Sequence, residues 1–115
     1  MTSIGLDYDF KDGNFIKDRL YYIMHKYNPS DLRLFISPTG RGYHIKFNTK
    51  IRFSVAELIK IRKKLGDDPN RISMVGRKYR DVLFDIKNVN GKIYRSKEID
   101  VDSFILFGKE VAING

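Results

Sequence analysis

The chain has 115 residues, of which 42% are hydrophobic, so it has room for one domain with a single core. It contains no cysteine and two histidines, which excludes disulfides, thiolate zinc sites and a cysteine nucleophile. Lys and Arg number 22 against 14 Asp and Glu, and the net charge of +8 favours a polyanionic partner, most often nucleic acid. No apolar run reaches the roughly 20 residues that span a bilayer, and the polar first residues do not resemble a signal peptide. We therefore expect a cytoplasmic protein.

The first predicted element is a strand at residues 3–10, where apolar and polar side chains alternate. The alternation places Asp7 and Asp9 together on the polar face of this strand. A turn follows, and Asn14 is suited to the N-cap of a helix whose apolar positions repeat at helical spacing as far as Tyr27.

Two more alternating segments, residues 31–37 and 43–48, predict a pair of strands joined by the glycine-containing turn 38–42. His44 and Lys46 fall on the polar face of the second strand. The same parity directs Phe35 outward from the first.

A second helix is predicted to begin at Ser54, because Ser54 and Glu57 have the spacing of a capping box. Gly66 is suited to end this helix. The polar stretch 67–80 predicts no regular element.

Residues 82–87 alternate again and predict a strand with Asp85 on its polar face. Asn90-Gly91 is a strong signal for a hairpin that returns through residues 92–95. The apolar run 104–107 is expected either to add an edge strand or to pack beneath the sheet.

Together these elements predict an α+β fold in a single domain, residues 1–115. The expected architecture is a ferredoxin-like or RRM-like βαββαβ antiparallel sheet, with two helices on one face and a C-terminal hairpin extension. In that architecture the first strand lies between the third and the fourth, and neighbouring strands are about 4.8 Å apart. The side chains of Asp7, Asp9, His44 and Asp85 would then converge on the face that the helices leave open.

Three clustered carboxylates form an oxygen-rich site suited to Mg²⁺ or Mn²⁺. A cation held in this way can bridge nucleotide phosphates and stabilise the attacking and leaving oxygens. The glycines of the turn before His44 allow the backbone to approach an anion, and Arg41 and Lys46 supply positive charge. An ordinary hairpin turn is the alternative interpretation of this segment.

Three segments, IGLDYDF, SPTGRGYHIKF and RKYRDVLFDIKN, resemble the three motifs of the archaeo-eukaryotic primase superfamily. They cover residues 3–9, 37–47 and 77–88 in the order that the family shows. The resemblance implies a minimal primase-polymerase core that acts on nucleoside triphosphates and a DNA template, with Mg²⁺ or Mn²⁺ as cofactor and with further replication subunits as possible partners. The implied metal ligands and catalytic residues are Asp7, Asp9 and Asp85. The expected nucleotide-binding residues are Ser37, Gly40, Arg41, Gly42, His44 and Lys46, and those for nucleic acid are Arg71, Arg77, Lys78 and Arg80.

Family members usually carry flanking modules, so the chain could also be one subunit of an assembly or a relic that kept the site without the activity. A noncatalytic RNA-recognition module is a second alternative, but acids occupy most of the face on which such modules stack bases, and only Phe35 is an outward aromatic. A rolling-circle replication nuclease needs a second histidine beside His44, where this chain has Lys46. A basic DNA-packaging protein is the remaining alternative.

Overall fold

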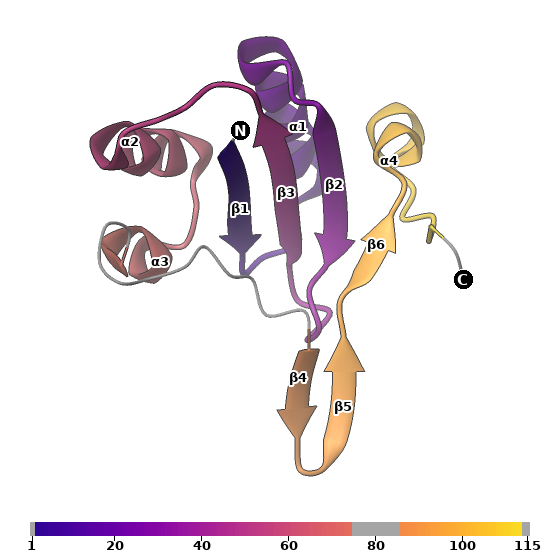
Figure 1. Ribbon diagram of the computed structural model, residues 1–115. Helices are drawn as coiled ribbons and strands as arrows, with labels where there is room; N and C mark the ends of the chain where they lie inside the picture. Colours follow the sequence, from indigo (N-terminus) through magenta and orange to yellow (C-terminus); the bar gives the residue numbers. More distant parts are fainter. Residues whose placement is uncertain (1, 75–85, 114–115) are drawn as a thin grey trace.

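The computed structural model describes residues 2–74 and 86–113, with the backbone alone at 71, 73, 74, 86, 87 and 89 (Figure 1). The elements, in chain order, are β1 (Thr2–Tyr8), α1 (Gly13–Tyr27), β2 (Asp31–Ile36), β3 (Tyr43–Thr49), α2 (Val55–Leu65), α3 (Pro69–Met74), β4 (Ile86–Val89), β5 (Lys92–Arg95), β6 (Lys97–Ile99) and α4 (Val101–Phe107).

An antiparallel sheet with the order β1-β3-β2-β6 forms the centre of the molecule, and β4 and β5 form a separate hairpin. This arrangement confirms the predicted α+β class and its ferredoxin-like character. One row across the sheet, Leu6, Ile45, Leu34 and Ile99, has an exposed fraction of 0% at each position. Burial of this row on one face of all four strands fixes their register, because a slip by one residue would turn these side chains to the other face.

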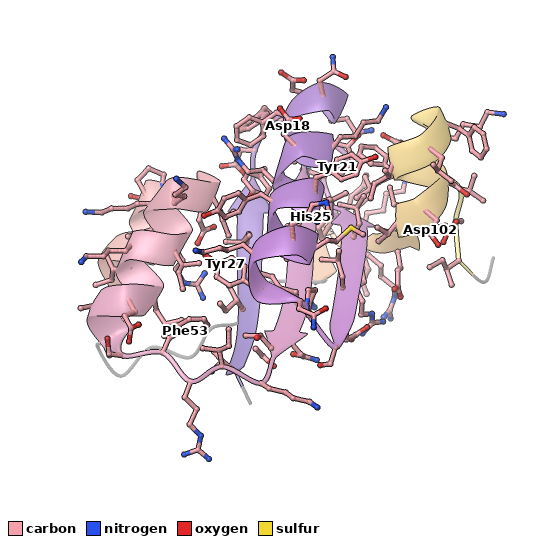
Figure 2. The ribbon with its side chains drawn as sticks, turned by 90° about the horizontal axis from the view of Figure 1, so that it is seen from above. Asp18, Tyr21, His25, Tyr27, Phe53 and Asp102 are labelled. Carbon is pink, nitrogen blue, oxygen red and sulfur yellow. The ribbon has the colours of Figure 1, made fainter. Side chains whose placement is uncertain are left out.

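Helix α1 covers the apolar face of the sheet and lies behind it in Figure 1. Its buried side chains are Ile16, Leu20, Ile23 and Tyr27. Figure 2, the view from above, shows α1 between α2 on one side and α4 on the other. Ile61 and Leu65 of α2 and Phe104 of α4 join the same core. Two helices were expected over this face, and α4 is a third helix that packs against the core.

Several local expectations were wrong. The side chain of Asp12 rather than Asn14 caps α1, accepting the backbone N–H groups of Asn14 and Phe15. Residues 69–74, predicted to be irregular, form the short helix α3. The run 104–107 forms part of α4 and no edge strand, because the carboxylate of Asp100 accepts the N–H of Ser103 and begins a helix there. The alternative expectation, packing beneath the sheet, is confirmed by Phe104, which is buried in the core.

The hairpin is confirmed at the predicted position. Asn90 and Gly91 have φ values of 52° and 82°, the positive φ at both central positions that a tight two-residue turn requires. Asn88 supports the turn, because its side-chain oxygen accepts the N–H of Gly91.

The outer edge of β1 differs from the expectation. Residues 82–87 were predicted to pair with this strand, but residues 82–85 lie outside the described ranges and Ile86 and Lys87 pair with β5. Two backbone groups of β1 are bound by side chains from α2 and from the residues just after it. Arg62 donates to the carbonyl of Gly5 at 2.6 Å, and Asp67 accepts the N–H of Asp7 at 2.8 Å. These two contacts compete with strand pairing at this edge of β1.

Candidate nucleotide and metal site

Asp7 and His44 lie directly opposite each other on β1 and β3, on the face away from α1. His44 Nε2 is 3.2 Å from Asp7 Oδ1. Pairing places Phe35 and Glu98 in the same row across β2 and β6. The predicted convergence of Asp7 and His44 on this face is therefore confirmed.

The imidazole of His44 is buried, with 5% of the residue exposed. Its Nδ1 atom has no hydrogen-bond partner within the described ranges. A buried polar atom in a folded protein normally has a partner, so Nδ1 is an exception among the described residues. Nε2 is engaged with the carboxylate of Asp7.

Asp9 lies just beyond the C-terminal end of β1 and is exposed. Burial of its carboxyl raises its pKa, the negative charges of Asp7 and Asp68 raise it further, and His44 opposes them. The charges of Asp7 and Asp68 therefore act on Asp9 in the same direction, and a bound cation would offset them. Within residues 2–74 and 86–113, no three His, Asp or Glu side chains surround a common metal position. Carboxylate oxygens are the donors that a hard divalent cation prefers.

The turn between β2 and β3 is closed by hydrogen bonds to Ser37. The N–H of Ser37 donates to the carbonyl of Gly42 at 2.9 Å, and the N–H of Gly42 donates to Ser37 Oγ at 3.2 Å. The N–H of Gly40 donates to the carbonyl of Ser37 at 2.9 Å, with φ at Gly40 of 72°. The N–H of Arg41 donates to Thr39 Oγ1 at 3.3 Å. The turn is therefore a defined structure with the exposed Arg41 at its tip.

This turn lies against the end of β1. A Cβ atom at Gly42 would be 1.8 Å from the carbonyl oxygen of Tyr8 and 3.1 Å from the Cα of Asp9, so only glycine fits. The close approach brings the turn next to Asp9 and joins two of the three predicted motifs at one end of the sheet.

Lys46 lies one row further along β3, paired with Gly5 and with Arg33. Its Nζ is 4.9 Å from the ring centroid of Phe35, and the guanidinium carbon of Arg33 is 5.2 Å from the same centroid. Phe35 faces outward as predicted, yet only 7% of it is exposed.

Sequence patterns did not reveal the buried ion pair between Arg62 and Asp67. Arg62 Nη1 donates to Asp67 Oδ2 at 2.9 Å, and both residues are almost fully buried. Asp67 Oδ1 accepts the N–H groups of Asp7 and Asp68, so this pair fixes the backbone that carries the candidate ligand Asp7. One signal could have indicated this ion pair. Arg62 lies one helical turn from Leu58 and from Leu65, so it falls on the helix face that was expected to be buried.

Several predicted site residues cannot be placed. Four of them lie outside the described ranges: Asp85, Arg77, Lys78 and Arg80. For Arg71 the structure describes the backbone, which is part of α3. Their predicted roles as third metal ligand and as nucleic-acid contacts stay predictions from the sequence.

None of the helices in the described ranges has the length and hydropathy required to cross a membrane. Comparison of the chain with protein-family models, with curated proteins and with solved structures finds no match.

Proposed function

We propose that this chain is a divalent-metal-dependent nucleotidyltransferase core of the primase type, which acts on nucleoside triphosphates along a nucleic-acid template. The observation that carries the proposal is the pairing of Asp7 with His44, beside a glycine turn that lies against the end of β1. Three chemically distinct groups, a carboxylate pair, an imidazole and an anion-suited turn, share one end of the sheet.

Asp7 and Asp9 hold Mg²⁺ or Mn²⁺ in this scheme, with Asp85 as the third ligand that the sequence motif supplies. The bound cation neutralises charge on the phosphates and on the attacking and leaving oxygens. The pKa of Asp9 is raised first by burial and then by the charges of Asp7 and Asp68, and a cation would offset the second of these causes.

His44, Arg41 and the backbone of the turn orient the triphosphate. The carboxylate of Asp7 lies 3.2 Å from Nε2 of His44 and thereby fixes the orientation of the imidazole ring. Nδ1 has no hydrogen-bond partner within the described ranges. Arg41 is exposed and adds positive charge at the turn. These groups bind and position the substrate and take no part in proton transfer.

A module that stacks bases on its open sheet face is disfavoured. Phe35 was the only outward aromatic expected there, and Lys46 and Arg33 lie over its ring and leave 7% of the residue exposed. A base cannot stack on a covered ring.

The test is Mn²⁺ titration by calorimetry, followed by nucleotide incorporation on primed and unprimed templates. The test variant is Asp7→Asn/Asp9→Asn, and the matched control is Asp31→Asn/Asp102→Asn, which removes two exposed carboxylates elsewhere, the second on α4 (Figure 2). We expect wild type and the control to bind Mn²⁺ and to incorporate nucleotides, and the test variant to do neither. Asp85→Ala should abolish incorporation. Equal Mn²⁺ binding by all variants would overturn the proposal.

A further inference from the structure

The β4–β5 hairpin projects from one end of the sheet (Figure 1). Residues 86–97 contain four basic residues, Lys87, Lys92, Arg95 and Lys97, and no acidic residue. The whole chain has 14 acidic residues against 22 basic residues. These twelve residues have basic side chains without acidic ones, so they are more positive than the rest of the chain. Its charge favours a polyanion.

The returning strand β5 combines charge with exposed apolar and aromatic surface. All four of its residues are exposed, with 59% for Ile93 and 41% for Tyr94. Because side chains alternate along a strand, Lys92 and Tyr94 lie on one face of the ribbon, and Ile93 and Arg95 lie on the other. A basic side chain therefore lies beside an exposed apolar or aromatic side chain on each face.

The ribbon leaves the sheet next to the candidate nucleotide site. Only Ser96 separates β5 from β6, and Lys97 at the start of β6 pairs with Ile36 at the end of β2. Ile36 directly precedes Ser37 and the turn that carries Arg41. A strand bound along the ribbon would therefore continue toward the end of the sheet that holds Asp7 and His44.

We infer that the β4–β5 ribbon binds single-stranded nucleic acid along the edge of β5 away from β4, where Lys92 and Arg95 reach the phosphates from opposite faces and Tyr94 stacks on a base. Positive charge that follows the backbone, with an aromatic ring for stacking, is the usual combination at such sites. A single strand fits better than a duplex, because the faces of duplex bases are already stacked on their neighbours. Binding at the ribbon does not depend on the metal site.

The first test measures fluorescence anisotropy of a labelled single-stranded DNA 20-mer in the presence of EDTA. The test variant is Lys92→Glu/Arg95→Glu, and the control is Lys26→Glu/Lys50→Glu, which reverses two exposed basic residues elsewhere and changes the net charge equally. We expect the test variant to lose at least tenfold more affinity than the control. The slope of log K against log salt should fall by about 1.4, since each phosphate contact to a single strand contributes about 0.7. Equal losses in the two variants would overturn the inference in favour of a diffuse positive surface.

A second test isolates stacking from charge. Tyr94→Ala should weaken binding about tenfold, as expected for loss of one stacked base, while Tyr94→Phe should bind like wild type. Tyr21→Ala removes a comparably exposed tyrosine on α1 (Figure 2) and should have no effect. Tighter binding of a duplex of the same sequence, of polyglutamate or of anionic vesicles would overturn the single-strand assignment. Asp7→Asn/Asp9→Asn should keep full DNA binding, so failure of the nucleotidyltransferase proposal and failure of this inference give different results.

Discussion

The carboxylate of Asp67 accepts the backbone N–H of Asp7 at 2.8 Å, which links two residues that are sixty positions apart in the chain. Its other oxygen binds Arg62, whose guanidinium also donates to the carbonyl of Gly5. One buried ion pair thus holds the edge of β1 at the point where Asp7 faces His44.

Replacing Asp67 with Asn should destabilise the protein by about 3–5 kcal/mol, because the change removes the negative charge beside a buried guanidinium. Urea denaturation measures the loss. The comparison is Glu98→Gln, which alters the more exposed pair between Arg33 and Glu98 and should cost at most about 1 kcal/mol. Similar losses for the two variants would contradict the structural role assigned to Asp67.

Gly42→Ala should destabilise the protein, because its Cβ would lie 1.8 Å from the carbonyl oxygen of Tyr8 and the turn would have to move from the end of β1. We expect a loss of about 1–3 kcal/mol or more in thermal denaturation. Gly40→Ala is the control, since a Cβ there meets no atom within 4 Å and the cost is limited to about 1–2 kcal/mol for its left-handed backbone. A larger loss for Gly40→Ala than for Gly42→Ala would show that the contact with Tyr8 is unimportant.

Tyr43→Phe should lower stability at pH 7 by about 1 kcal/mol, because the Tyr43 hydroxyl donates to Glu110. This hydrogen bond, assisted by the Lys11 ammonium, lowers the pKa of Glu110 below its ordinary value of 4.5. The folded state therefore holds its proton less tightly than the unfolded state, and the stabilisation is present above pH 4.5 and is lost as pH falls through the lowered pKa.

Melting temperatures at pH 7 and at pH 3 check this prediction. The difference between wild type and Tyr43→Phe should be clear at pH 7 and should shrink in acid. Tyr21→Phe, which changes an exposed hydroxyl, should match wild type at both values. A difference for Tyr43→Phe that is independent of pH would mean that its hydroxyl acts otherwise than through the ionised Glu110.

Elements whose signals are local were predictable from the sequence. The capping box at Ser54 and Glu57 begins α2 as expected, and Asn90-Gly91 makes the tight turn of the hairpin. Alternation along β1 and β3 predicted that Asp7 and His44 share the open face, because side-chain parity is fixed by backbone geometry alone.

Features that depend on tertiary contacts were not predictable in this way. Residues 104–107 read equally well as a strand or a helix, and the N-cap at Asp100 decides between them. Asp67 looked like part of an irregular polar stretch, because its partners Gly5 and Asp7 lie far away in the sequence. Phe35 likewise has the cations Lys46 and Arg33 over its ring, and these come from two different strands.

The side chains that occupy the outer edge of β1 have a consequence for how copies of this chain behave at high concentration. Exposed strand edges recruit other strands and lead to aggregates. Arg62 and Asp67 take up the Gly5 and Asp7 backbone groups that a second molecule would need for such pairing. The same contacts that fix the candidate ligand Asp7 therefore disfavour pairing of a second molecule at this edge of β1.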